Sequence, residues 1–247
     1  GAAAGGTYTI PFAVRLTGAL DRPALEAALN DVVARHESLR TLFPERLGVP
    51  RQEILAPSAA RLSLAVERVS EASLAPVLSA ASRRGFDLSS EPPLRAQLYA
   101  LGENASGEAE HVVLLLLHHI AGDGWSLSPL WRDLAEFYAA RLAGRPAQLP
   151  ALPVQYADYT LWQQGVLGDE GDASSALSRQ LSYWSDRLKG LPDQLDLPTD
   201  RPRPAVASHR GDAIAVSLPA ALHGALLKLA RESGSSQWAS STTTTRP

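Results

Sequence analysis

Hydrophobic and polar residues repeat with two different periods at the start of the chain. Residues Tyr8–Leu16 alternate with a period of two and are rich in β-forming residues, which predicts a strand. Asp21 then stands at a helix N-cap position with Pro23 in the first turn, so a helix is predicted from there to about Glu37. Five apolar residues recur at helical spacing along it: Leu25, Ala28, Leu29, Val32 and Val33.

The longest purely apolar run of the chain is Val112–Leu117. It lies inside the most strongly predicted strand, His111–His118, and it lacks the alternation of a half-buried strand. Such a run predicts burial on both faces of a sheet. A polar loop around Gly102–Glu110 is expected before this strand and a second loop, Ile120–Leu127, after it.

Shorter patterns predict the remaining elements, which alternate in a mixed α/β order without an internal repeat. Helices are expected over Ser73–Arg84, Ser128–Gly144, Tyr156–Gln164, Ala176–Leu188 and Pro219–Glu232. Strands or extended segments are expected over Ser38–Phe43, Arg51–Leu55, Leu62–Val69, Leu94–Leu101 and Ile214–Leu218, with a proline-rich linker over Leu191–Pro204.

The amino-acid composition excludes several classes of protein and of functional site for this chain. Of 247 residues, 45% are hydrophobic and 20% charged, and the net charge of −3 offers no basic surface for nucleic acid or an anionic membrane. The absence of cysteine excludes disulfides, thiolate metal sites and a cysteine nucleophile. No apolar run is long enough to cross a bilayer, and the first residues do not resemble a secretion signal, so a cytoplasmic location is predicted.

The histidine pair at the end of the apolar strand is the main candidate for chemistry. Successive strand residues point to opposite faces, so of His118 and His119 one is expected to face a cavity while the other packs into the fold. The alternative is that both are core histidines. Asp123 can hold the shape of the following loop, Gly122 and Gly124 let the backbone approach a ligand, and a neutral imidazole can accept a proton from an attacking amine or hydroxyl.

Three other chemistries fit the sequence less well. A metal site made of His118, His119 and Asp123 is disfavoured by the opposed directions of adjacent strand residues. A serine-hydrolase elbow requires Gly-x-Ser-x-Gly, whereas Gly124-Trp125-Ser126 is followed by Leu-Ser. No phosphate-binding loop of the Gly-Lys-Ser/Thr kind is present in the sequence.

Four segments carry a specific family resemblance. Residues 118–126, HHIAGDGWS, resemble the HHxxxDGWS signature of condensation domains of non-ribosomal peptide synthetases. Residues 35–43 resemble the RHExLRTxF motif of that family, residues 156–162 its YxDYxxW motif, and residues 197–204 the LPTDRPRP stretch that commonly follows. Together they extend the resemblance over about residues 8–232.

The resemblance implies a chloramphenicol-acetyltransferase-like α/β fold, in which a mixed β-sheet packs with helices. It implies an acyltransferase of antibiotic and other secondary metabolite biosynthesis that forms an amide bond between aminoacyl or peptidyl thioesters. These substrates would arrive on the phosphopantetheine arms of donor and acceptor peptidyl carrier proteins, so no intrinsic cofactor or metal is expected. Further partners would be the neighbouring synthetase domains.

The resemblance also implies roles for single residues. His119 would be the catalytic histidine, either as general base or as a group that positions the amine, with His118 as a packing or hydrogen-bonding neighbour. Asp123 would be structural, ion-paired with Arg35 or Arg40, and Gly124 would offer its backbone amide to the substrate region. A fold-supporting role is expected for the other motif residues: Trp125, Ser126, Tyr156, Asp158 and Trp162.

The family motifs divide the chain unevenly. Residues 1–189 are expected to form the N-terminal lobe of a condensation domain, residues 190–212 a linker and residues 213–232 the start of the C-terminal lobe. The Ser/Thr-rich residues 233–247 are expected to be disordered and unrelated to the family. Two hypotheses follow: a lobe active only within a complete domain, or a catalytically inactive truncated fragment or carrier-protein-binding module.

Overall fold

A computed structural model describes residues 6–193, 195, 198–202, 204–206 and 216–233 of the chain. The chain divides into two compact units, residues 1–195 and 196–247. The first unit is an α/β structure built on a four-stranded mixed sheet, which agrees with the predicted fold class.

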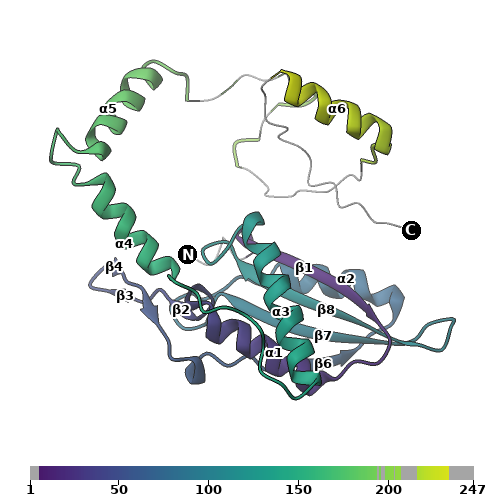
Figure 1. Cartoon of the computed structure of the whole chain (residues 1–247). Helices are drawn as coiled ribbons and strands as arrows, with labels where there is room; N and C mark the ends of the chain where they lie inside the picture. The colour runs from purple at the N-terminus through teal and green to yellow at the C-terminus, as the bar shows by residue number, and fades with distance from the viewer. Residues whose placement is uncertain (1–5, 194, 196–197, 203, 207–215, 234–247) are drawn as a thin grey trace. The chain divides into compact units, whose positions relative to one another are not determined.

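The sheet has the strand order β1-β8-β7-β6 (Figure 1). Both β1 and β7 pair with β8 in antiparallel fashion, whereas β6 pairs with β7 in parallel. The strands are β1 (Thr9–Thr17), β6 (Ala65–Arg68), β7 (Leu94–Glu103) and β8 (Ala109–His118).

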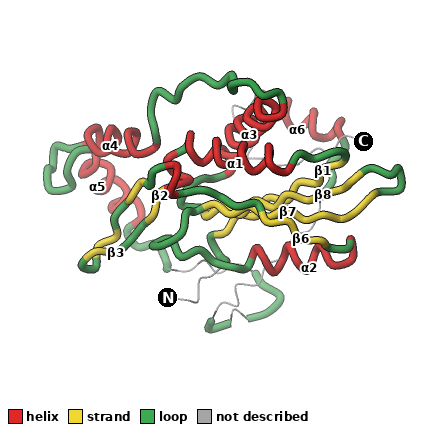
Figure 2. The backbone as a smooth tube through the Cα atoms, turned by 90° about the horizontal axis from the view of Figure 1, so that it is seen from below, coloured by secondary structure: helices red, strands yellow, loops and turns green. Residues whose placement is uncertain are grey.

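Strand β8 is buried on both faces, as its unbroken apolar run predicts. Val113, Leu115 and Leu117 join the core formed with helices α1 (Arg22–Arg35) and α3 (Leu127–Leu142). The alternate side chains, Val112, Leu114 and Leu116, join a second core with Leu74 of helix α2 (Glu71–Ser82). Figure 2 shows the two layers, with α1 and α3 on one face of the sheet and α2 on the other.

The first helix forms as the sequence predicts. The Asp21 carboxylate accepts a hydrogen bond from the Ala24 amide at 2.9 Å and caps the helix, while Pro23 lies in its first turn. The five apolar residues at helical spacing, which run from Leu25 to Val33, are all buried. Helix α1 ends at Arg35, so the motif residue His36 stands at its C-cap.

The segment after this helix differs from the prediction. Residues Ser38–Phe43 are not extended throughout, because Glu37–Arg40 form the 3-10 turn η2 and only Thr41–Leu42 form a strand, β2. The Thr41 hydroxyl donates to the Glu37 carbonyl at 2.7 Å, which stabilises the turn, and the turn buries Leu39 in the core. Tertiary burial therefore overrides the extended pattern here.

The other elements lie near their predicted positions. Strand β5 (Glu53–Ile54) pairs with β2, and β3 (Glu45–Arg46) pairs with β4 (Val49–Pro50) in a hairpin that the pattern does not predict. The rest are η3 (Pro57–Ala59), η4 (Gly124–Ser126), α4 (Tyr156–Leu167), α5 (Ala176–Leu188) and α6 (Ala220–Glu232).

Two predicted features fall partly or wholly outside the described residues. Of the expected strand Ile214–Leu218, only residues 216–218 are described, and they form no strand. The expected disordered tail lies outside the described residues apart from Ser233. Within the described part of the chain, none of the helices combines the length and hydropathy that a membrane span requires.

Candidate active site

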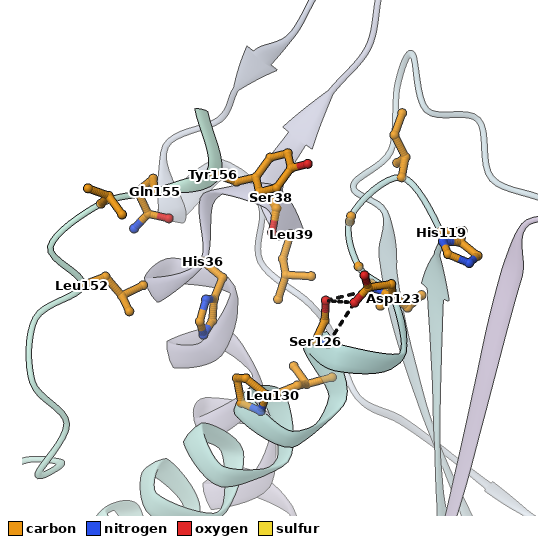
Figure 3. Close-up of a pocket in the computed structure, with 16 residues that line it drawn as sticks. His36, Ser38, Leu39, His119, Asp123, Ser126, Leu130, Leu152, Gln155 and Tyr156 are labelled. Atoms are coloured by element: carbon orange, nitrogen blue, oxygen red, sulfur yellow. Dashed lines mark hydrogen bonds between the residues drawn. The ribbon is translucent and has the colours of Figure 1, made fainter. Parts of the chain in front are cut away.

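A cleft of about 500 Å³ lies beside the end of β8, with further walls from η2, the start of α3 and the segment before α4 (Figure 3). His119 and Asp123 stand on one side in that view and His36 and Gln155 on the other. Apolar side chains make up much of its wall, including Leu39, Leu130, Leu152 and Val154. The described lining residues include no lysine, arginine or glutamate.

The two histidines of the motif take different environments. Strand β8 ends at His118, and the backbone amide of His119 donates to the Tyr8 carbonyl at 2.8 Å. His119 is exposed and lines the cleft, whereas His118 packs against the rings of Tyr8 and Phe86 and is not among the lining residues. The His118 Nδ1 accepts a hydrogen bond from the Ile120 amide at 3.0 Å. This arrangement matches the prediction that one histidine faces a cavity and the other packs.

Burial gives His118 a defined effect on the pH dependence of stability. Desolvation, and then the nearby charge of His119, hold the pKa of His118 below its usual value. The folded state therefore favours neutral His118. The stability that this preference contributes is fully present above the unfolded-state pKa of about 6.5. As the pH falls from about 6.5 toward the lower folded-state pKa, the unfolded chain takes up a proton first and stability is lost.

We expect His118→Phe to remove this part of the pH dependence. The free energy of unfolding, measured with urea between about pH 7.5 and pH 5.5, should fall less steeply for the variant than for the natural chain. Equal slopes for the two proteins would contradict this role of His118.

The Asp123 carboxylate organises the loop that follows β8. Its Oδ1 accepts hydrogen bonds from the Trp125 amide at 3.0 Å, the Ser126 amide at 3.1 Å and the Ser126 hydroxyl at 2.9 Å. The Ser126 hydroxyl also lies 3.0 Å from the Asp123 amide, which completes a capping box around η4. These bonds, led by that of the Ser126 hydroxyl, hold the pKa of Asp123 below its usual value. Asp123 is thus a local scaffold for the cleft loop.

The expected ion pair of Asp123 with Arg35 or Arg40 is wrong. Among the described residues Arg35 pairs with Asp133 at 2.9 Å and Arg40 pairs with Glu37 at 3.2 Å. The Asp123 carboxylate accepts its hydrogen bonds from residues of its own loop, so it does not require a distant cation. Arg35 faces α3 because α1 and α3 pack side by side on the sheet.

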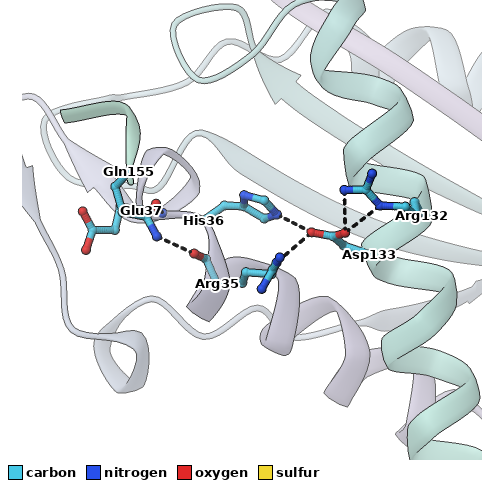
Figure 4. Close-up of polar contacts among 6 residues, drawn as sticks. All are labelled: Arg35, His36, Glu37, Arg132, Asp133 and Gln155. Carbon is cyan, nitrogen blue, oxygen red and sulfur yellow. Dashed lines mark hydrogen bonds and ion pairs between the residues drawn. The ribbon is translucent and has the colours of Figure 1, made fainter. Parts of the chain in front are cut away.

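Asp133 is the centre of a buried polar network that the sequence did not reveal (Figure 4). Its side chain is fully buried, and its Oδ2 accepts from Arg35 Nε at 2.9 Å and His36 Nε2 at 2.8 Å. Arg132 donates to the other carboxylate oxygen at 3.2 Å. Burial acts to raise the pKa of Asp133, but the hydrogen bonds from His36, Arg35 and Arg132 outweigh it, so the pKa lies below its usual value.

Gln155 ties the segment before α4 to the same region. Its side-chain amide nitrogen donates to the Arg35 carbonyl at 3.0 Å, and its side-chain oxygen accepts from the Glu37 amide at 3.1 Å. The two bonds flank His36 in the chain. Gln155 therefore fixes the backbone of a cleft-lining residue from both sides.

The remaining motif residues have mixed environments. Gly124 and Trp125 are absent from the described lining residues of the cleft, and Trp125 is 89% exposed. Asp158 caps α4 by accepting from the Gln155 amide at 2.8 Å, in line with a fold-supporting role. Tyr156 lines the cleft but is largely exposed, as is Trp162. The roles predicted for Gly124, Trp125, Tyr156 and Trp162 remain predictions.

We expect Asp123→Ala to loosen the cleft loop without unfolding the chain. Removing the carboxylate leaves the Trp125 amide without its acceptor, whereas the Ser126 amide keeps the Asp123 carbonyl at 3.1 Å. Hydrogen exchange should therefore accelerate at least about tenfold at Trp125 and less at Ser126. Exchange measured by NMR or mass spectrometry checks this. Asp172→Ala is a matched control, since Asp172 holds the Ser174 amide and hydroxyl in the same way in another loop. Unchanged exchange at residues 125 and 126 in Asp123→Ala would contradict the scaffold role.

Comparison with known proteins gives consistent matches. The family model described as "Condensation domain" matches residues 3–238. The chain is 52% identical over 225 residues to a dimodular nonribosomal peptide synthase of Bacillus subtilis, covering 91% of the chain and 9% of that protein. It is 45% identical over 230 residues to the isonitrile lipopeptide synthase of Mycobacterium tuberculosis, covering 91% of the chain and 9% of that protein.

Solved structures show the same similarity. The X-domain from teicoplanin biosynthesis has 38% sequence identity and a TM-score of 0.79, over 93% of this chain and 49% of that one. The first condensation domain of the calcium-dependent antibiotic synthetase shares the fold, with a TM-score of 0.60 and 23% identity over 76% of this chain and 44% of that one. The chain thus spans about half the length of the solved chains and a small part of the curated relatives.

Proposed function

Because this chain belongs to the condensation-domain family of non-ribosomal peptide synthetases, we propose that it carries the catalytic histidine for peptide (amide) bond formation. The substrates are aminoacyl or peptidyl thioesters bound to carrier proteins. The proposal rests on the position of His119, which is the first residue after the buried strand β8 and lines the cleft.

The reaction needs one proton acceptor close to the attacking amine. The amine nitrogen of the acceptor thioester attacks the carbonyl carbon of the donor thioester, so a C–N bond forms and the C–S bond breaks. The donor sulfur leaves as a thiolate, and the proton that the amine loses finally converts this thiolate to the free thiol. His119 either accepts that proton as a general base or positions the amine through a hydrogen bond. Asp123 supports either role by fixing the loop that follows His119.

The partners follow from this chemistry. The substrates reach the cleft on phosphopantetheine arms of a donor and an acceptor peptidyl carrier protein, and neighbouring synthetase domains supply and receive them. A structure of the teicoplanin X-domain in complex with OxyB shows that a relative of this chain binds a further protein. We also propose a cytoplasmic location, with which a chain that can form no disulfide is compatible.

We also propose the division of the chain that its motifs predict. Residues 1–189 are assigned to the N-terminal lobe, residues 190–212 to a linker and residues 213–232 to the start of the C-terminal lobe. The boundary between the two compact units, at residues 195 and 196, falls inside this linker and supports the assignment.

An alternative function is carrier-protein binding without catalysis. Helices α4 and α5 favour it, because they expose a group of apolar side chains that suits an interaction surface. Its largest members are Tyr156, Tyr159, Leu161, Trp162, Tyr183 and Trp184.

A two-part assay tests the proposal. The 247-residue chain is mixed with donor and acceptor carrier proteins loaded with amino acids, and dipeptidyl thioester is followed by mass spectrometry. In parallel, the chain replaces the matching segment of the Bacillus subtilis synthase, with which it shares 52% identity. Product from either protein supports condensation. Carrier binding without product from either protein supports the alternative.

A further inference from the structure

A second histidine lines the cleft besides His119. His36 stands at the C-cap of α1, where its backbone amide donates to the Val32 carbonyl at 3.0 Å. Its side chain keeps 23% of its surface exposed and belongs to the cleft wall. His36 lies on the α1 side of the cleft, and His119 lies on the opposite side, beyond the end of β8 (Figure 3).

The orientation of the His36 ring is fixed by a buried carboxylate. Nε2 lies 2.8 Å from Asp133 Oδ2, and Asp133 is fully buried. The pKa of Asp133 lies below its usual value, so at neutral pH this carboxylate is ionised and can only accept hydrogen bonds. Nε2 of His36 must therefore carry a proton and donate it to Asp133.

The same bond leaves the other ring nitrogen available. In neutral His36 the proton on Nε2 makes Nδ1 a hydrogen-bond acceptor. Nδ1 has no hydrogen-bond partner among the described residues, and it is not among their buried polar atoms without a partner. It is thus open to solvent or to a molecule in the cleft.

Further contacts fix the backbone of His36 and the carboxylate that orients its ring. Gln155 bonds the backbone on both sides of His36, at the Arg35 carbonyl and the Glu37 amide. Arg35 and Arg132 bind the same Asp133 carboxylate, so the group that orients His36 is itself held by two guanidinium groups (Figure 4). Such preorganisation typifies a binding group more than a surface histidine.

We propose that His36 is a substrate-binding residue that accepts a hydrogen bond from the α-amine of the acceptor aminoacyl group. This inference rests on the proposed function, because it places the acceptor amine in the cleft that contains His119. Asp133 and Gln155 act through His36 as positioning residues. The absence of lysine and arginine from the described cleft wall suits this amine, since neither cation competes for the acceptor nitrogen or repels the amine.

The first test reads the His36 ring directly in the full chain by long-range ¹H–¹⁵N NMR at about pH 7.5. In the free protein we expect the pattern of a ring protonated on Nε2, with Nδ1 free. The probe is alanyl-pantetheine amide, which carries a free amine and an amide in place of the thioester. The matched probe is propionyl-pantetheine amide, which lacks the amine.

The two probes give separable outcomes. The alanyl probe should shift the His36 Nδ1 signal, and the propionyl probe should not. Shifts at His119 but not at His36 with the alanyl probe would overturn the role of His36 and leave the proposed function intact. Shifts at neither histidine with either probe would overturn the placement of the acceptor amine in this cleft, and with it the role of His36. The proposed function is judged separately, by product formation in the two-part assay.

A pair of variants separates binding from folding. His36→Phe removes the Nδ1 acceptor and should weaken binding of the alanyl probe about three- to tenfold, the loss expected for one hydrogen bond, with no effect on the propionyl probe. His36→Gln offers a replacement acceptor and should recover part of that affinity. Equal weakening of both probes in His36→Phe, without recovery in His36→Gln, would indicate a merely structural residue.

Discussion

Replacing His119 with alanine should lower the rate of dipeptidyl thioester formation by about 10²- to 10⁴-fold, the usual contribution of a positioned general acid or base. The loss should appear in the protein in which the chain replaces the matching segment of the Bacillus subtilis synthase. Because His119 is exposed at the cleft and its side chain makes no hydrogen bond, ion pair or ring contact with the described residues, the fold should be retained. Single-turnover product formation, followed by mass spectrometry, measures the effect.

Two companion variants make the result specific. His119→Gln can accept a hydrogen bond from an amine but cannot take its proton, so it should be as slow as His119→Ala if His119 is a general base. Substantial activity in His119→Gln would instead favour the amine-positioning role. His223→Ala is the control, because His223 lies on α6 and is not among the residues of the cleft. A rate within about twofold of the unmodified protein for His119→Ala would sink the catalytic assignment.

Replacing Asp133 with alanine should destabilise the chain by about 3–5 kcal/mol, the cost of removing one partner from a buried ion pair. Asp133 is fully buried, and Arg35, which is 13% exposed, would lose its counter-charge in the same step. Such a loss is a large fraction of the stability of a typical domain. Urea unfolding at neutral pH, followed by circular dichroism, measures it.

A double variant distinguishes the ion pair from a general packing defect. Arg35→Met combined with Asp133→Leu removes both charges and should recover part of the stability, because no unpaired charge stays buried. Glu136→Ala on the same helix is the matched control: its partner Arg145 lies at the surface, so the change should be small. A double variant no more stable than Asp133→Ala would contradict the ion-pair explanation.

The acid limb of the stability curve should carry the signature of the same carboxylate. The pKa of Asp133 is lower in the folded state, so its stabilisation is present above the unfolded-state value of about 4. It is lost as the pH falls through the folded-state pKa. Asp133→Asn should therefore show a weaker loss of stability on acidification than the natural chain, beginning from a lower stability at neutral pH.

Local sequence signals accounted for most of the fold. The apolar run Val112–Leu117 predicted a strand buried on both faces, and the structure confirms it with separate cores on the two sides of β8. Asp21 predicted the start of α1 within a residue, since a cap acts on the next few amides only. No local pattern predicts the turn at Glu37–Arg40, because the burial of Leu39, a tertiary contact, decides its conformation.

The candidate site was predictable only in part. The motif HHIAGDGWS placed the two histidines, and the alternation of a strand correctly separated a cleft-facing His119 from a packed His118. The ion-pair partner of Arg35 was wrong, because charge and spacing along the chain do not show which carboxylate packs opposite. The sequence does not distinguish Asp133 from any other charged residue of an amphipathic helix.

The sequence by itself thus determined the order of the elements, the family motifs and the histidine at the end of β8, all of which depend on residues close together in the chain. Only the tertiary structure decided which side chains share the cleft. Arg35 and Asp133 are 98 positions apart, and they meet because α1 and α3 cover the same face of the sheet. Gln155 reaches the backbone beside His36 across a similar separation. Packing of whole elements, which no local pattern encodes, makes His36 part of the site.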